Sequence, residues 1–539
     1  MHTKKNVLVI YTDQQRYDAC GYAGNLVART PNIDALADDG LVYTRHYASN
    51  PVCQPSRASL LTGRHLRAHR LIDNGMALPL DEVTMPQIFA EAGYATACVG
   101  KLHLDCWSSP DSPEGFARWG TGEMDDWTGP HYGFQEIRTC MGHGEGASGH
   151  YGLWRQERFP DIAIGPGNAQ GEENYPAINC YKSNLPKEAH CNAWILEETL
   201  NFLDRKGDQP FYLHASFPDP HGPFVPPAPY NTMFREAEMP AAHYREGEHD
   251  TKPRIYRDAM AGGPENEYNR DGGPWYMGNM RDTALRQAIA HTHGMNAFID
   301  DTVGRLIQAL KERGLYENTI IVYTADHGDF LGDHDYLVKG ILPCDALTHI
   351  PLIVRDPDGT KGVEARVNSN VDIMPTLLQK CGLTIPEGVQ GVPLPEPGGP
   401  CRRDYAYETG YSKISPEFHH YSIVKDKVRF SIFPHLEDGE LYDLTVDPYE
   451  LTNLYHHPDW QERRQALHEE LLFAVGKAEP RISPAQYLPF VTGLVPEAVR
   501  LEGGGHGGQG VAEGCAPPAL SVYWRGAATG IRSGDARGY

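Results

Sequence analysis

One cysteine stands at the start of a segment that could build a nucleophilic site. The segment Cys53–Gly63 reads CQPSRASLLTG, and Arg57 lies four residues after the cysteine. An ordinary cysteine nucleophile forms a covalent ester that water must then attack. If a helix begins near Ser56, the Arg57 guanidinium lies about one turn from the nucleophile, and the helix N-terminus favours anions. The alternative interpretation is a buried free thiol in front of a helix.

Two pairs of polar residues follow apolar runs that we expect to be strands. Asp13 and Gln14 end one run, Asp326 and His327 end another, and Cys53 lies between them in sequence. The carboxyl ends of strands are where α/β sheets bind ligands, although a single Asp after a strand is usually a turn or cap residue. Two carboxylates, an amide oxygen and an imidazole suit one divalent ion, Ca²⁺ or Mn²⁺, with the imidazole favouring Mn²⁺. These four residues and residue 53 are the predicted ligands.

Four further basic residues have a motif context. Lys101 and His103 are alternate residues, so in an extended segment both side chains face the same side. His221 lies in a loop whose shape is restricted by prolines, and Lys339 follows Asp326 and His327 along the chain. Because the chain has 25 His, only those within motifs are considered as candidates. Because its formal net charge is −23, an anionic substrate must be bound by local positive charge.

Taken in order along the chain, these segments resemble the type I sulfatases of the alkaline phosphatase superfamily. In that family a formylglycine-generating enzyme oxidises the Cys of a C-x-P-S-R core to formylglycine (3-oxoalanine). After one hydroxyl of the aldehyde hydrate has taken up the sulfate group, the hydrate can expel this group by collapsing back to the aldehyde. Water therefore need not attack the sulfur a second time. The resemblance covers residues 5–460 and includes the family's L-Y-D-L…D-P…E…N-L pattern at Leu441–Leu454.

The resemblance also implies a role for each basic residue. In sulfatases the residue matching Lys101 binds a sulfate oxygen, and the one matching His103 takes a proton from the second hydroxyl of the hydrate. Those matching His221 and Lys339 contact the scissile ester oxygen, with His221 the better candidate for the general acid. The expected reaction is hydrolysis of a small aryl or alkyl sulfate monoester to an alcohol and inorganic sulfate.

The metal-binding pairs depart from the commonest sulfatase pattern. Many sulfatases carry Asp-Asp and Asp-Asn, whereas the D-Q and D-H pairs found here resemble phosphonate monoester hydrolases. Asn74 also fits an anion-contacting, substrate-binding position of that sister group. Those hydrolases, however, lack the K-x-H pair of Lys101 and His103 and usually have Ala where Ser56 stands. A sulfatase is therefore favoured over a phosphonate monoester or phosphodiester hydrolase, and a non-catalytic sulfate-ester binder with a free Cys53 thiol is the third possibility.

The elements that position these residues predict an α/β fold. Short β-branched runs alternate with helical patterns, which favours a large, mostly parallel mixed sheet flanked by helices. An apolar stripe over 298–310 has helical spacing and is expected in the core. Residues 105–190 and 218–280 are weakly patterned, so we expect insertions that wall the active-site mouth. The expected strands are Val7–Thr12, Ala95–Val99, Phe211–His214, Thr319–Thr324 and Leu352–Val354.

A Pro- and Gly-rich run at 389–403 suggests a linker. We therefore predict a catalytic domain over 1–400, a small C-terminal antiparallel sheet with a helix over 401–480, and an extension over 481–539. The Gly-rich extension is expected to be flexible or to lie at the interface of a homo-oligomer, a dimer or a tetramer. The expected C-terminal elements are strands at Tyr405–Glu408, Tyr421–Lys425 and Val428–Phe433, then Leu441–Leu444 and a helix from about Trp460.

Composition bounds the compartment and the partners. The eleven Cys are scattered without a C-x-x-C pair, which favours free thiols in a reducing cytoplasm. The apolar run after Lys4 and Lys5 is too short for a signal peptide, and none approaches the ~20 residues of a membrane span. The strongly negative net charge argues against a nucleic-acid partner. The sequence thus predicts a cytoplasmic protein without a membrane or nucleic-acid partner.

Overall fold

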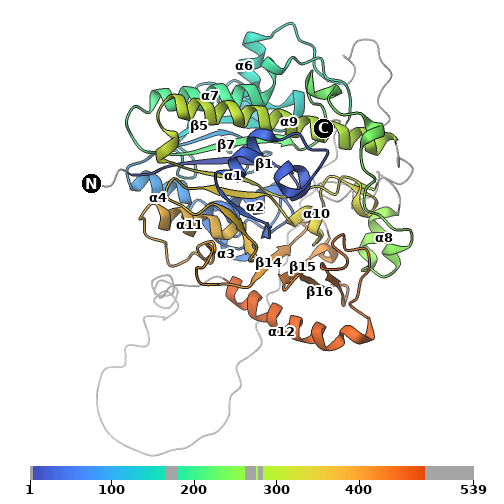
Figure 1. Ribbon diagram of the computed structural model, residues 1–539. Helices are drawn as coiled ribbons and strands as arrows, with labels where there is room; N and C mark the ends of the chain where they lie inside the picture. The colour runs from blue at the N-terminus through green and yellow to red at the C-terminus, as the bar shows by residue number, and fades with distance from the viewer. Residues whose placement is uncertain (1–3, 166–179, 262–274, 277–282, 414, 480–539) are drawn as a thin grey trace, which may run out of the picture. The chain divides into compact units, whose positions relative to one another are not determined.

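The computed structural model describes residues 4–165, 180–261, 275–276, 283–413 and 415–479 (Figure 1). Within these residues a nine-stranded sheet has the order β12-β2-β11-β9-β1-β7-β4-β5-β6. Its strands are β1 (Asn6–Asp13), β2 (Leu41–Tyr43), β4 (Ala95–Gly100), β5 (Glu136–Met141), β6 (Ser148–Gly149), β7 (Phe211–Pro220), β9 (Thr319–Ala325), β11 (Leu352–Arg355) and β12 (Gly362–Glu364).

The centre of this sheet is parallel. Strand β1 pairs in parallel with β7 on one side and β9 on the other, and β4 and β5 continue the parallel order beyond β7. Strand β11 runs antiparallel to β9, so the sheet is mixed. All five predicted strands of the large sheet are present, and the expected mostly parallel mixed sheet is confirmed.

Helices cover both faces of the sheet because successive residues of its central strand point to opposite sides. Leu8 and Ile10 of β1 pack with one set of helices, and Val7 and Val9 pack with the other. The predicted apolar stripe over 298–310 is buried as expected, with Phe298 in a neighbouring cluster and its other apolar residues in the first core. The first set is α1 (Pro31–Asp38), α7 (Cys191–Arg205) and α9 (Thr283–Glu312); the second is α2 (Cys53–Thr62), α4 (Met85–Glu91) and α11 (Ile373–Lys380).

The expectation of unpatterned insertions is wrong for part of 105–190. Residues 136–158 form β5, β6 and helix α6 (His150–Arg158), and β5 belongs to the large sheet. The strand was missed because Glu136 and Arg138 stay partly exposed, which dilutes its apolar character. Smaller elements are β3 (His46–Tyr47), α3 (Leu66–His69), α5 (Phe116–Gly120), α8 (Arg254–Met260), β8 (Trp275–Tyr276), β10 (Tyr336–Leu337), α10 (Asp345–Thr348) and β13 (Asn368–Ser369).

The C-terminal part forms a separate four-stranded antiparallel sheet, as expected. Helix α12 packs on it through Leu467 and Leu471. The predicted domain bounds stay predictions, and the extension over 481–539 lies outside the described residues. No helix in the described ranges is long and apolar enough to cross a membrane. The elements are β14 (Tyr405–Gly410), β15 (His420–Lys425), β16 (Val428–Phe433), β17 (Asp438–Asp443) and α12 (Gln461–Ala478).

One buried arginine ties the C-terminal sheet to the preceding part of the chain. Arg429 of β16 is fully buried and donates to Glu408 (2.5 Å) and Glu450 (2.6 Å). Its third ion pair, at 3.2 Å, reaches Asp345 in α10. A buried guanidinium must be compensated by carboxylates and hydrogen bonds, and these three acids provide that compensation.

We expect Arg429→Leu to lower the free energy of unfolding by ~3–5 kcal/mol, because it leaves buried carboxylates without a partner. Thermal or urea unfolding measures the loss. The matched control is Arg463→Leu, which breaks a pair with Asp426 whose side chains are 34% and 63% exposed. That change should cost less than ~1 kcal/mol. Equal losses for the two variants would contradict the structural role of Arg429.

Candidate active site

Five functional side chains lie at the ends of five neighbouring parallel strands. Asp13 ends β1, Lys101 follows β4, His143 follows β5, His221 follows β7 and Asp326 follows β9. These strands are adjacent in the order β9-β1-β7-β4-β5. Because they are parallel, their carboxyl ends meet at one edge of the sheet, which is where α/β proteins bind ligands. The fold therefore gathers residues that are more than 300 positions apart in sequence.

Cys53 lies at the first position of helix α2 and is buried. The helix thus begins three residues before the expected start near Ser56. The Cys53 Sγ atom is 3.1 Å from Nε2 of His327 and 3.7 Å from Oδ1 of Asp13. Burial and Asp13 raise the pKa of the thiol, but Lys101 and other cations lower it by more, so the net shift is downward. The thiol therefore lies in a positively charged surrounding at a helix N-terminus.

The predicted anion-contacting residue Asn74 lies beside this helix start. Its Oδ1 accepts a hydrogen bond from the backbone N–H of Gln54 at 3.1 Å, so it satisfies one of the free donors of α2. The Ser56 hydroxyl donates a hydrogen bond to the backbone oxygen of Asp326 at 2.6 Å. In the ligand-free protein Asn74 thus positions the segment that carries Cys53.

Four of the five predicted metal ligands come together. One donor atom each of Asp13, Cys53, Asp326 and His327 lies within 4.8 Å of the others. His327 donates from Nδ1 to the Gly328 oxygen at 2.7 Å, so Nε2 is the ring nitrogen that faces the cluster. Two carboxylates and an imidazole fit a hard or borderline divalent ion. The Cys53 sulfur stands where an oxygen of formylglycine would be.

Gln14, the fifth predicted ligand, borders this cluster. Its backbone N–H donates to Asp326 at 3.0 Å, and its Oε1 accepts from Lys339 Nζ at 3.2 Å. The other side-chain atom, Nε2, donates to Asp329 at 2.7 Å. Gln14 has a φ of 66°, which turns the chain sharply after Asp13. Its backbone therefore contacts a metal donor, while its amide oxygen holds Lys339.

The two oxygens of Asp13 serve different neighbours. Oδ1 faces Cys53 and His327, whereas Oδ2 forms an ion pair with Lys101 and lies 3.5 Å from Arg57 Nη2. Although burial alone raises the pKa of Asp13, Lys101 and the other positive groups lower it well below its usual range. Asp13 is therefore ionised, with one oxygen left for a metal ion.

Arg57 joins several parts of the site by hydrogen bonds. Its Nε donates to Asp326 at 2.8 Å, and its Nη1 donates to the Lys101 backbone oxygen at 2.8 Å. The guanidinium also lies over the Tyr11 ring, 4.8 Å from its centroid. Arg57 thereby contacts both carboxylates of the predicted metal site and the start of the K-x-H segment. The sequence had suggested only that Arg57 lies near the nucleophile.

His221 and Lys339 form one pair. Lys339 Nζ is 2.5 Å from His221 Nε2, and His221 Nδ1 donates to the Gly222 oxygen at 2.7 Å. His221 Nε2 is therefore the acceptor and the Lys339 ammonium is the donor. Burial, His143 and Lys339 lower the pKa of His221 well below its usual range. In the ligand-free protein the proton of this pair thus resides on Lys339.

Sequence reasoning missed His143. Its ring stacks on that of His221, with centroids 3.6 Å apart and planes 9° from parallel. Its Nε2 accepts from Lys101 Nζ at 2.8 Å and is 3.5 Å from Asp13. Burial and Lys101 lower the pKa of His143 to about 4, so the ring is neutral. The alternation in Glu136–Met141 was the available signal, since a strand there places His143 at the carboxyl edge.

His103 reaches the site by a different backbone path from the one expected. Its φ is 58°, so the segment after Lys101 is not extended. Glu114 holds the turn by accepting from the His103 backbone N–H at 2.6 Å. Burial, Lys101 and Arg57 lower the pKa of His103 well below its usual range. Its Nδ1 is buried without a hydrogen-bond partner in the described part of the chain, so a neutral ring keeps a free nitrogen.

If the cluster holds a divalent ion, Asp326→Ala should weaken Mn²⁺ or Ca²⁺ binding by more than ~100-fold, since loss of a mere outer-shell partner costs 10–100-fold. Calorimetric titration of metal-stripped protein measures this. The control is Asp300→Asn, a buried carboxyl that belongs to none of the candidate donor groups and accepts from Asn32. Retained affinity in Asp326→Ala would show that the ion, if any, binds elsewhere.

Comparison with known proteins agrees with this geometry. The arylsulfatase of Clostridium perfringens is 30% identical over 491 residues, which cover 87% of this chain and 94% of that protein. The multifunctional alkaline phosphatase superfamily protein PehA of Trinickia caryophylli is 29% identical, over 85% and 92% of the two chains. The crystal structure of the phosphonate monoester hydrolase of Agrobacterium radiobacter matches with a TM-score of 0.76 and 27% identity, over 89% and 99%.

Two family models match as well. The model of the N-sulphoglucosamine sulphohydrolase C-terminal region covers residues 332–476, which include the antiparallel sheet. The Sulfatase model covers residues 5–383, which carry every residue of the cluster around Cys53. This chain belongs to the sulfatase family, whose members generally use a metal ion and formylglycine.

Proposed function

We propose that the protein hydrolyses a small aryl or alkyl sulfate monoester to an alcohol and inorganic sulfate. One observation carries the proposal: Lys101, Lys339 and the His221 ring meet around Cys53 beside a set of metal donors. The arylsulfatase name of the Clostridium perfringens relative supports it. The proposed active form contains formylglycine at position 53, made by a formylglycine-generating enzyme, and one divalent ion, Ca²⁺ or Mn²⁺.

Positive charge provides the recognition of the sulfate group. Lys101 and Lys339 are 4% and 7% exposed, and both lower the pKa of the Cys53 thiol, so both lie within electrostatic reach of residue 53. A unit charge ~4 Å from an opposite one gains ~4 kcal/mol at an effective dielectric of ~20. Two such cations compensate a bound sulfate monoester in a protein whose net charge is −23.

Hydrolysis breaks the bond between sulfur and the ester oxygen, and the alcohol leaves with a proton. Formylglycine hydrate at position 53 would supply the attacking hydroxyl, and a divalent ion held by Asp13, Asp326 and His327 would supply positive charge at the sulfate oxygens. A nearby sulfate raises the pKa of His221, so its ring can take the proton of the Lys339–His221 pair. The pair then delivers this proton to the departing alcohol oxygen. His103, which keeps a free ring nitrogen, accepts the proton that accompanies release of inorganic sulfate.

A phosphonate monoester hydrolase is the second candidate. The similarity to the Agrobacterium radiobacter enzyme and the Gln14 and His327 pattern at the metal site favour it. Lys101 and His103 favour the sulfatase. Comparing kcat/KM for phenyl sulfate and a phenyl phosphonate ester separates the two. The cytoplasmic location and the homo-oligomer, a dimer or a tetramer, stay predictions.

Maturation of Cys53 is the first test. Protein co-expressed with a formylglycine-generating enzyme should show a loss of about 18 Da in the peptide that contains residue 53. Cys53→Ala should lose turnover and keep its unfolding temperature. The matched control is Cys106→Ser, a partly exposed cysteine outside the metal donor group, which should keep both the mass loss and the rate. Full activity with an unmodified Cys53 would refute the proposal.

Leaving-group dependence tests how His221 and His103 divide the proton transfers. His221→Ala should lose ~10²–10⁴ in rate on an alkyl sulfate and far less on a nitrophenyl sulfate, whose alcohol leaves without a proton. His103→Ala should instead give a burst of alcohol release followed by slow turnover on both substrates. Stopped-flow measurements resolve the two patterns. Equal losses of His221→Ala on both substrates would transfer the acid role to Lys339.

His143 should act as a positioning residue. His143→Phe keeps a ring against His221 but removes the acceptor for Lys101, so we expect KM to rise about tenfold with little change in kcat. His143→Gln keeps an acceptor but removes the stacking partner, so kcat on an alkyl sulfate should fall instead. His456→Phe, at a histidine that is 70% exposed, is the control. Identical effects of the two substitutions would indicate a purely structural residue.

A further inference from the structure

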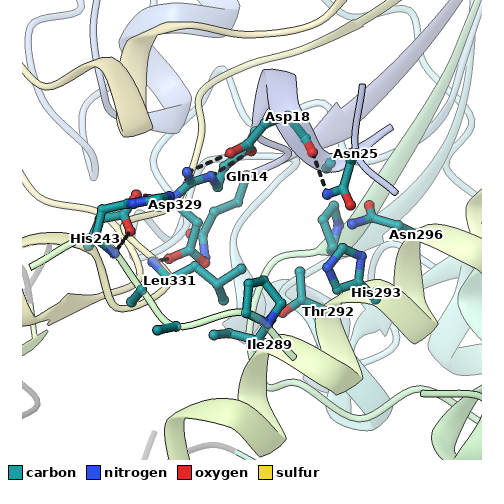
Figure 2. Close-up of a pocket in the computed structure, with 17 residues that line it drawn as sticks. Gln14, Asp18, Asn25, His243, Ile289, Thr292, His293, Asn296, Asp329 and Leu331 are labelled. Carbon is teal, nitrogen blue, oxygen red and sulfur yellow. Dashed lines mark hydrogen bonds and ion pairs between the residues drawn. The ribbon is translucent and has the colours of Figure 1, made fainter. Parts of the chain in front are cut away.

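A cavity adjoins the cluster around Cys53. Its volume is about 90 Å³, and it lies between the segment after β1, the loop at 240–243, helix α9 and the loop after β9 (Figure 2). A single buried water needs only ~10–15 Å³ measured in this way. The cavity therefore has room for an organic group of several atoms.

Gln14 belongs to both the cavity and the catalytic cluster. Gln14 lines the cavity, and its side chain links Lys339 (3.2 Å) to Asp329 (2.7 Å), which also lines it. Pro220, another lining residue, directly precedes His221. The cavity thus borders the Lys339–His221 pair, which is the side of the cluster assigned to the departing alcohol.

The α9 side of the cavity carries an unsatisfied polar group. His293 is 7% exposed, and its Nδ1 has no hydrogen-bond partner among the described residues. Figure 2 shows its ring between Asn296 and Thr292. A buried ring nitrogen without a partner costs free energy, which a hydrogen-bonding ligand recovers. Ile289 and Leu331 supply apolar surface nearby, so the cavity suits a group with both a hydrocarbon part and a hydrogen-bonding part.

The charges around the cavity disfavour an anion. Arg16 lines it, but this guanidinium is already paired with Asp18 and Asp333, each at 2.7 Å. Asp329 is a third lining carboxyl. Three acids against one paired base leave no free cation among these four residues for a second sulfate or a carboxylate.

We propose that this cavity is the subsite for the alcohol part of the substrate. It selects monosulfates of small alcohols that carry a neutral hydrogen-bonding group, and it rejects alcohols with a second anionic group. This inference rests on the proposed sulfatase activity for its role in turnover, while binding of the alcohol itself does not depend on hydrolysis.

Three substrates with one ring and different substituents test the selectivity: 3-(hydroxymethyl)phenyl, 3-methylphenyl and 3-carboxyphenyl sulfate. We expect kcat/KM to be highest for the hydroxymethyl ester and lowest for the carboxylate. His293→Phe keeps the ring and removes its hydrogen bonds, so the preference for hydroxymethyl over methyl should fall about tenfold. An unchanged ratio in His293→Phe would overturn the assignment of His293.

A blocking variant tests the cavity directly. Ala241→Trp places a large ring at an exposed lining position, and Ala237→Trp places the same ring at an exposed position of the preceding 3₁₀ helix, Glu236–Glu238, outside the cavity. Binding of 3-(hydroxymethyl)phenol, followed by saturation-transfer NMR, should be lost only in Ala241→Trp. Inhibition by inorganic sulfate should be unchanged in both, because sulfate binds at the Cys53 cluster.

The outcomes separate the two proposals. If the wild type binds the phenol in a manner that Ala241→Trp abolishes but hydrolyses no sulfate ester, the subsite stands and the proposed function fails. If the wild type hydrolyses aryl sulfates and Ala241→Trp changes neither phenol binding nor kcat/KM, the cavity is not the alcohol subsite and the proposed function stands.

Discussion

Charge balance between buried groups is the constraint on which the site depends. Asp13 and Asp326 are both 0% exposed, and an unpaired carboxylate in such a place is strongly unfavourable. Lys101 and Arg57 compensate them, and Oδ1 of Asp13 still faces Cys53 and His327. The arrangement keeps Asp13 ionised and holds Arg57 and Lys101 beside the two carboxylates.

Neutral imidazoles complete the balance. His103, His143 and His221 all have a pKa below the usual range, because burial and the neighbouring cations disfavour further positive charge. Each ring can therefore accept a hydrogen bond or a proton. The mutual stacking of His143 and His221 links Lys101 to Lys339 through two rings, so the two cations proposed to bind the sulfate are joined by one continuous set of contacts.

The same scaffold serves two kinds of tetrahedral anion in this superfamily. The metal donors of this chain suit either anion, and the solved phosphonate monoester hydrolase shares the fold over 89% of the chain. Discrimination must then arise from groups that surround the anion and the alcohol. Lys101, His103 and the cavity beside Gln14 are where this chain offers such groups.

The sequence alone was enough to predict the residues that meet at Cys53 and the five strands of the large sheet, because each depends on a local motif or on a short apolar run. It offered only a weak signal for His143, whose strand has partly exposed polar residues, and none for the pairing of Arg57 with both Asp13 and Asp326. It also placed His103 on an extended segment, whereas Glu114 holds a turn there. These features depend on which strand ends and loops become neighbours, and only the tertiary structure decides that.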